Sequence, residues 1–221
     1  MRTVFLDRDG VINANRADHV KSWSEFHFLP GALEALALLA KENFKVFIIT
    51  NQAIINRGIV SHSVVDDINR RMVQAVQEYK GKIEAVLYCP HRPEENCGCR
   101  KPKPGLLYEV AKVYGLDLSQ CHLVGDAISD ITAGLEAGCR SILVLSGRGA
   151  QQLLSWEARR LSGYMVAQDL QRAARHIIRE EMAREAAPPA SEPIGTQRKP
   201  DYGGAWSAGI SSLRKESVHG P

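Results

Sequence analysis

The stretch TVFLDRDG, residues 3–10, joins a short run of apolar and β-branched residues to two carboxylates. Such a run is typical of a buried parallel strand. Asp7 and Asp9 stand two positions apart, so strand spacing predicts that their side chains project to one side while Arg8 turns away. Two like charges this close are costly unless a cation, a shared proton or a phosphoryl group lies between them. Taken alone, a D-x-D-G stretch is more often a pair of turn or helix-cap aspartates.

The rest of the chain alternates short apolar runs with helical patterns. The predicted strands are residues 3–7, 45–50, 85–89, 122–126 and 141–145, with 164–167 as a candidate sixth. The predicted helices are residues 31–42, 61–79, 104–114, 128–137 and 169–184. This alternation predicts an α/β fold with a doubly wound, mostly parallel sheet. In such sheets, ligands bind beyond the carboxyl ends of the strands.

The chain of 221 residues is long enough for one sizeable core. We expect one domain over residues 1–186. From residue 187 the composition turns to Pro, Gly and Ser without periodicity, which predicts a disordered tail over 187–221. Only short insertions, at 11–29 and 52–60, interrupt the predicted elements besides the cysteine-rich loop, so no large cap domain is expected.

Composition excludes several classes of partner. The net charge of +3 comes from basic residues spread along the chain, so nucleic acid is not an expected partner. No apolar run approaches the roughly 20 residues that cross a bilayer, and the N-terminus turns acidic too early for a signal peptide. We expect a cytoplasmic monomer that binds no membrane and forms no disulfides.

Polar residues recur where other predicted strands end. Thr50 and Asn51 end the second strand, and Asp126, with Asp130 four residues later, ends the fourth. Lys101 follows the third strand at the end of a cysteine-rich loop. Each alone has an ordinary alternative as a helix cap or a solvated charge. Together they are expected to converge at one edge of the sheet.

This combination suits phosphoryl transfer through an aspartyl phosphate. One carboxylate attacks phosphorus, and a second protonates the leaving oxygen and then activates water. A hydroxyl and an ammonium hold the phosphoryl oxygens, while a hard cation on oxygen ligands offsets the developing charge.

A separate cluster, C-x-H-x5-C-x-C, comprises Cys89, His91, Cys97 and Cys99. Three thiolates and one imidazole are the ligand count of a closed tetrahedral Zn²⁺ site, which leaves no position open for substrate. The alternative is a group of free cysteines. A structural zinc in this loop, residues 89–99, would determine where the next two residues, Arg100 and Lys101, point.

As a set, the motifs D-x-D-G, strand-ending Thr, Lys and G-D-x-x-x-D resemble the haloacid dehalogenase (HAD) superfamily of phosphatases over residues 3–148. The resemblance implies Asp7 as nucleophile, Asp9 as general acid and base, Thr50 as phosphate ligand and Lys101 as the residue that steadies the nucleophile and the phosphoryl group.

The same resemblance implies a catalytic Mg²⁺ held by Asp7, the backbone carbonyl of Asp9 and Asp126. Asp130 would then lie in or near the outer coordination shell of the ion.

The stretches FLDRDGVIN, FLPGALEAL, TNQ, YCPH, CGCRKPKPG and VGDAISDI together resemble the D-glycero-D-manno-heptose 1,7-bisphosphate 7-phosphatases. Their relatives, the histidinol-phosphate phosphatases, share the zinc loop. The resemblance implies a phosphorylated sugar as substrate, with histidinol phosphate as the alternative. Asn51 and Arg100 are the substrate-binding candidates, and Arg100 is expected to bind a second anionic group.

Two departures from that family leave the sugar open. Ala53-Ile54-Ile55 replaces the usual Ser-Gly-Ile, and His19 stands where a Tyr often precedes Val. Both were expected near the substrate entrance.

Two rival classes share part of this pattern. A receiver-type signalling domain also forms an aspartyl phosphate, but its phosphoacceptor ends the third strand, where this chain has Tyr88-Cys89. A catalytically inactive zinc-stabilised binding module is the other rival, although every expected catalytic position carries a competent residue.

Overall fold

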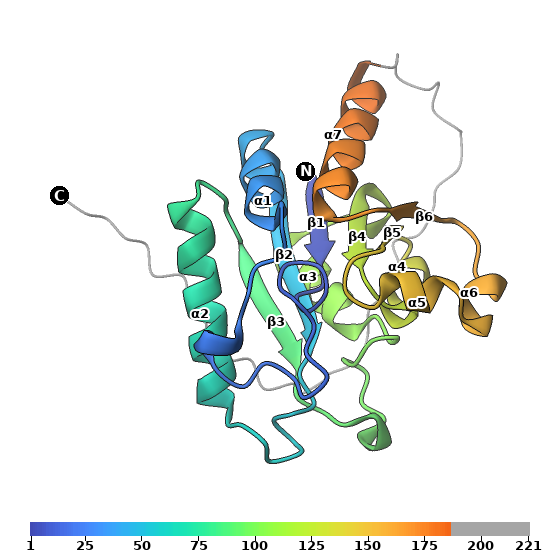
Figure 1. The fold of residues 1–221 in the computed structure, drawn as a ribbon. Helices are drawn as coiled ribbons and strands as arrows, with labels where there is room; N and C mark the ends of the chain where they lie inside the picture. The colour runs from blue at the N-terminus through green and yellow to red at the C-terminus, as the bar shows by residue number, and fades with distance from the viewer. Residues whose placement is uncertain (187–221) are drawn as a thin grey trace.

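The computed structural model describes residues 1–186, so the predicted tail over 187–221 lies outside the described residues. Six parallel strands form a single sheet in the order β3-β2-β1-β4-β5-β6 (Figure 1). Their bounds are β1 Thr3–Leu6, β2 Lys45–Asn51, β3 Ala85–Cys89, β4 Cys121–Gly125, β5 Arg140–Val144 and β6 Tyr164–Ala167. The predicted doubly wound α/β sheet is confirmed, including the candidate sixth strand.

Residues 1–186 contain seven α-helices, of which the first six lie between strands and the last follows β6: α1 Ala32–Lys41, α2 His62–Glu78, α3 Gly105–Tyr114, α4 Ile128–Glu136, α5 Gly149–Leu153, α6 Trp156–Arg160 and α7 Leu170–Ala186. One-turn 3-10 helices lie at Trp23–Glu25, Pro93–Glu95 and Leu118–Gln120. The five predicted helices are present. Asp169 caps α7 as expected, because its carboxylate accepts the Arg172 N–H at 2.8 Å. The short α5 and α6 were not predicted, since five residues are too few for a helical period to be visible.

Alternating strand residues supply two hydrophobic cores, one on each face of the sheet. Val4 and Val46 are register partners and pack with α1, α2 and α7 on one face. Phe5 and Phe47 are the next pair, and they pack with α3 on the other face. Their ring centroids lie 5.7 Å apart. Each central strand is therefore apolar on both sides, as expected for a parallel sheet covered by helices.

The strand order reverses between β1 and β4, because the chain winds from β1 to β3 on one side and from β4 to β6 on the other. In doubly wound sheets, the crevice at this point is where ligands bind. Within residues 1–186, the segments that surround it are loops and one-turn helices rather than a cap domain. Among the described residues, no helix is both long and apolar enough to cross a membrane.

We propose that residues 1–186 are the folding unit, because every hydrophobic core cluster among the described residues lies between Val4 and Ile178. A chain ending at Ala186 is expected to melt within about 3 °C of the full chain. Ile177→Ala, which opens a cavity under α7, is expected to cost about 2–5 kcal/mol. Thermal and urea unfolding of both proteins test this. A large loss of stability in the shortened chain would show that the domain extends past residue 186.

Candidate active site

The floor of the candidate site is an ion-paired cluster around Lys101. Asp7 directly follows β1, and its N–H donates to the Val124 carbonyl at 2.9 Å, which extends the β1–β4 ladder by one residue. The Lys101 ammonium lies 2.8 Å from Asp7 Oδ1 and 2.6 Å from Asp130 Oδ1. It also donates to the Ile49 carbonyl at 2.6 Å. Each of its three protons therefore has an acceptor, as a buried ammonium requires.

Burial and charge determine the protonation preferences of this cluster. Burial opposes the charge on Lys101, but Asp130 and Asp7 outweigh it and raise the pKa of the lysine. Burial raises the pKa of Asp7 to about 6 against the opposing Lys101 ammonium, and the negative charges of Asp130 and Asp9 add to the rise. The cluster thus holds more negative charge than the single ammonium offsets.

Asp9 lies in a different environment, because Arg8 does not turn away from it. The Arg8 side chain is 1% exposed and folds back, so that Nη2 lies 3.0 Å from Asp9 Oδ2 while Nη1 donates to Asn69 Oδ1 at 2.9 Å. The expectation from strand spacing was wrong here, since β1 has already ended. Burial opposes ionisation of Asp9, but Arg8 and two amide hydrogen bonds outweigh it and lower the pKa of this carboxyl.

Gln52 connects Asp9 to Thr50. Its Nε2 donates to Asp9 Oδ2 at 2.9 Å and to Thr50 Oγ1 at 3.0 Å. Gln52 and Thr50 are both buried, while Asp9 is partly exposed at the cleft. The Gln52 amide therefore orients both the Asp9 carboxylate, which the family resemblance implies as general acid and base, and the Thr50 hydroxyl, which it implies as phosphate ligand.

Asp126 follows β4 and is fully buried. Its Oδ2 accepts from Asn15 Nδ2 at 2.5 Å and from the Arg148 N–H at 2.8 Å. Gly10 lies against it with φ +92°, and a Cβ at this position would stand 2.1 Å from Asp126 Oδ2. The close approach of the loop after β1 to Asp126 therefore requires glycine at position 10.

The carboxylates of Asp7, Asp126 and Asp130 each have an oxygen within 4.8 Å of the other two. All three side chains are buried. Burial raises the pKa of Asp126 and the charge of Asp7 adds to the rise, although Arg148 opposes it. A buried set of hard oxygen ligands with excess negative charge fits a divalent cation such as Mg²⁺. Both oxygens of Asp130 already have donors, Lys101 and the Ala127 N–H at 3.0 Å, whereas Lys101 contacts Oδ1 of Asp7.

Asn51 contacts the backbone of Lys101 on both sides. Its Nδ2 donates to the Lys101 carbonyl at 3.0 Å, and its Oδ1 accepts the Lys101 N–H at 3.2 Å. Both polar atoms of Asn51 are thus engaged by the residue whose ammonium lies beside Asp7. The geometry gives Asn51 a positioning contact, and its predicted contact with substrate stays a prediction.

The four predicted zinc ligands lie together in the loop after β3. Five of the six pairs among their ligand atoms are 3.3–3.5 Å apart, and all pairs lie within 4.8 Å: Cys89 Sγ, His91 Nδ1, Cys97 Sγ and Cys99 Sγ. A tetrahedron with such edges has its centre about 2.1 Å from each corner, close to the bond lengths of a zinc site. The cysteines form no disulfide. The donor set and its spacing therefore fit Zn²⁺.

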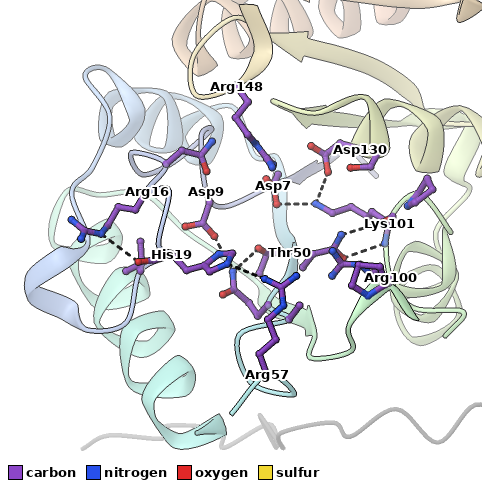
Figure 2. Close-up of a pocket in the computed structure, with 18 of the residues that line it drawn as sticks. Asp7, Asp9, Arg16, His19, Thr50, Arg57, Arg100, Lys101, Asp130 and Arg148 are labelled. Carbon is purple, nitrogen blue, oxygen red and sulfur yellow. Dashed lines mark hydrogen bonds and ion pairs between the residues drawn. The ribbon is translucent and has the colours of Figure 1, made fainter. Parts of the chain in front are cut away.

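A cleft of about 590 Å³ opens above this floor (Figure 2). Asp7, Asp9, Thr50 and Lys101 line it together with cationic side chains from four separate loops: Arg16, Arg57, Arg100 and Arg148. Arg100 donates to the His91 carbonyl at 3.2 Å, which anchors its guanidinium to the zinc loop. The site is thus negative at its floor and positive around its walls.

The two departures noted in the sequence lie differently in the structure. His19 lines the cleft, and its Nε2 lies 3.3 Å from Arg57 Nη1. Ala53 also lines the cleft, but Ile54 and Ile55 pack into a small apolar cluster with Val65. The expectation that the whole Ala-Ile-Ile segment lies at the substrate entrance therefore holds for its first residue alone.

Comparison with known proteins agrees with this geometry. Residues 98–173 match the family model described as HAD-hydrolase-like. The chain is 39% identical over 150 residues to the D-glycero-beta-D-manno-heptose-1,7-bisphosphate 7-phosphatase of Pseudomonas aeruginosa, covering 68% of this chain and 84% of that protein. It is 36% identical over 180 residues to the enzyme of the same name from Bordetella bronchiseptica, covering 81% and 99%. The chain belongs to the heptose-bisphosphate phosphatase family of HAD hydrolases.

A solved structure of this family supports the assignment. The D,D-heptose 1,7-bisphosphate phosphatase of Bordetella bronchiseptica, crystallised with magnesium and phosphate, superposes with a TM-score of 0.77 at 36% identity. The alignment covers 81% of this chain and 99% of that one. Membership confirms the enzyme class expected from the sequence, a phosphoric monoester hydrolase of the HAD type. It also removes the receiver domain from consideration.

Several residues at this HAD site were not found from the sequence. Arg8, Asn15, Gln52 and Arg148 all contact a predicted catalytic or metal-binding carboxylate. Gln52 belongs to the TNQ motif, so its position was a usable signal. Arg148 lies in the loop after β5, and only the rule that ligands bind beyond strand ends pointed there.

We expect Asn51→Leu to act through Lys101 rather than through substrate. The two hydrogen bonds to the Lys101 backbone stabilise the position of the lysine by about 1–3 kcal/mol. Their loss is therefore expected to lower turnover by roughly five- to a hundredfold. The loss is expected to be equal for p-nitrophenyl phosphate and for a sugar bisphosphate, with KM little changed. Steady-state kinetics on both esters measure this. A selective rise in KM for the bisphosphate would instead assign Asn51 to substrate binding.

Proposed function

We propose that this protein is a magnesium-dependent phosphatase that removes the 7-phosphate of D-glycero-D-manno-heptose 1,7-bisphosphate through an aspartyl phosphate on Asp7. The observation that carries the mechanism is the buried Asp7 carboxylate, held 2.8 Å from the Lys101 ammonium at the floor of an open cleft. The names of the relatives support the choice of substrate.

In the first step, an Asp7 oxygen attacks phosphorus while the bond from phosphorus to the sugar oxygen breaks. Lys101 and the Thr50 hydroxyl donate hydrogen bonds to the phosphoryl oxygens, and Lys101 also fixes the position of Asp7. Asp9 gives its proton to the leaving oxygen. In the second step, Asp9 takes a proton from water, the water oxygen attacks phosphorus, and the Asp7 carboxylate is released with inorganic phosphate.

Asp7, Asp126 and the backbone carbonyl of Asp9 are the groups proposed to hold Mg²⁺. The ion, when bound, offsets the negative charge that gathers on the transferred phosphoryl group. Asp130 is proposed to act on the other side of the floor, because its two oxygens accept from Lys101 and from the Ala127 N–H at 3.0 Å. It thereby holds the ammonium in place.

The zinc cluster is proposed to be structural. Cys89 ends β3, and Cys99 lies two residues before Lys101. A four-ligand site within this loop would fix a segment whose side chains from Arg92 to Asn96 are exposed and supply little apolar packing. It has no open coordination position for substrate or water.

The charge on the cleft walls favours a substrate with two anionic groups. One phosphate reaches the floor, and a second group meets Arg16, Arg57 or Arg100. Histidinol phosphate, the alternative, carries an ammonium at its far end, which these guanidinium groups would repel. The cytoplasmic location and the monomeric state stay predictions.

Activity on a panel of phosphate esters tests the proposal. We expect heptose 1,7-bisphosphate to be preferred over histidinol phosphate, with Asp7→Asn reducing every turnover rate by several orders of magnitude. Arg100→Ala is expected to lower kcat/KM for the bisphosphate by about ten- to a hundredfold, since a charged contact contributes about 1.5–3 kcal/mol. It should affect p-nitrophenyl phosphate far less. Equal losses on both esters would mean that Arg100 contacts the reacting phosphate instead.

Substitutions at the two proposed metal sites are expected to have different effects on zinc content, stability and turnover. Cys97→Ser should reduce bound zinc, lower the melting temperature and lower turnover together, because the loosened loop misplaces Lys101. Asp126→Asn should lose turnover while retaining zinc. Elemental analysis, melting curves and kinetics on both variants measure this. A Cys97→Ser protein with normal melting and turnover would refute the structural role.

A further inference from the structure

The loop after β5 lies directly on Asp126. The Ser146 hydroxyl donates to the Gly10 carbonyl at 2.8 Å. Gly147 has φ +59°, and a Cβ there would stand 2.4 Å from Asp126 Oδ2 and 2.5 Å from Gly10 Cα. The next residue, Arg148, therefore leaves the backbone immediately beside the buried carboxylate, with its side chain turned into the cleft (Figure 2).

Asp126 has two kinds of partner. Its Oδ2 accepts two short hydrogen bonds from neutral donors, the Asn15 amide at 2.5 Å and the Arg148 N–H at 2.8 Å. The Arg148 guanidinium contacts both oxygens at longer range, with Nη2 3.4 Å from Oδ1 and Nε 3.4 Å from Oδ2. Both of these contacts are longer than an ordinary N–H···O bond of about 2.7–3.2 Å. The Asp126 side chain is 0% exposed, whereas that of Arg148 is 55% exposed.

We propose that the Arg148 guanidinium and the catalytic cation compete for the Asp126 carboxylate, so that Arg148 neutralises Asp126 in the metal-free enzyme and moves away from it, within the cleft, when Mg²⁺ binds. This rests on the proposed cation site at Asp7 and Asp126. A guanidinium and a divalent ion at one carboxylate repel each other, and the ion, with hard oxygen ligands on two buried aspartates, is the stronger competitor.

The geometry allows this exchange at little cost. The neutral donors hold Oδ2, so Asp126 keeps its orientation when the guanidinium leaves. The Arg148 side chain is half exposed, and its backbone N–H bond to Asp126 does not depend on where the guanidinium points. Arg148 already lines the cleft, where the oxygens of a bound phosphate are its natural acceptors.

Magnesium affinity, measured by titration calorimetry on the metal-free enzyme, tests the exchange. Arg148→Met removes the competing charge but keeps the backbone donor, so it is expected to bind Mg²⁺ about two- to fivefold more tightly than the wild type. Arg148→Lys retains a positive charge, so its magnesium affinity is expected to lie between those of the wild type and Arg148→Met. Arg57→Met is the matched control, because it removes a cleft guanidinium that pairs with His19 rather than with Asp126. Its magnesium affinity is expected to be unchanged.

Melting temperatures supply a second readout. Without metal, Arg148→Met is expected to melt below the wild type, because Asp126 has lost its counter-charge. Saturating Mg²⁺ is expected to raise its melting temperature by more than that of the wild type.

Equal or weaker magnesium binding in Arg148→Met would overturn the inference, and so would an equal gain in Arg57→Met, which would indicate a general field effect. Absence of magnesium binding in the wild type would overturn the proposed cation site itself, a result distinct from unchanged affinity in the variant.

Discussion

The structure of this site depends on one buried ammonium. Lys101 lies with its charge away from solvent, and such a charge is stable only when its neighbours neutralise it and accept all of its protons. Asp7 comes from the end of β1, Asp130 from the first turn of α4 and the Ile49 carbonyl from β2. The lysine therefore holds three elements together, and its own backbone is held by Asn51 and by the zinc loop that precedes it. Any change that moves Lys101 also deprives two buried carboxylates, Asp7 and Asp130, of their counter-charge.

The pKa values of the two motif aspartates, Asp7 and Asp9, are shifted in opposite directions. The pKa of Asp7 is raised to about 6 and that of Asp9 is lowered, although the mechanism needs an ionised nucleophile and a protonated acid. A cation beside Asp7 would further favour the ionised form of this carboxyl, and a negative phosphate beside Asp9 would favour protonation of the other. Bound ligands would thus shift both carboxyls toward the protonation states that the proposed mechanism requires.

The sequence allowed prediction of those site residues that lie at the carboxyl ends of parallel strands, where ligands bind in doubly wound sheets. Thr50 lies in the last two residues of β2, and Asp7 and Asp126 directly follow β1 and β4. Parallel strands bring their carboxyl ends to one edge of the sheet, so the convergence of these three residues could be predicted. The four candidate zinc ligands could be picked out from their spacing alone, and the structure brings their ligand atoms together. Arg8 was misjudged because strand alternation ceases when the strand does, and a long side chain can fold back on its neighbour.

Asn51 and Arg148 show a second limit of sequence reasoning. The contacts of Asn51 with the Lys101 backbone depend on how two loops meet, so the sequence did not predict them, while its predicted contact with substrate stays a prediction. The position of Arg148 follows from the close packing of Gly147 on Asp126, a contact between residues far apart in the chain.

We propose that substrate choice depends on how the cleft walls are held, because within residues 1–186 loops and one-turn helices, rather than a cap domain, surround the cleft. Arg16 and Arg57 come from different loops, and His19 connects them: its carbonyl accepts from Arg16 at 3.3 Å and its ring nitrogen lies 3.3 Å from Arg57. Burial and the Arg57 charge lower the pKa of His19, so the ring is neutral and accepts the hydrogen bond from Arg57. His19 therefore ties the loop that carries Arg16 to the loop that carries Arg57, so one residue positions two of the cations on the cleft walls.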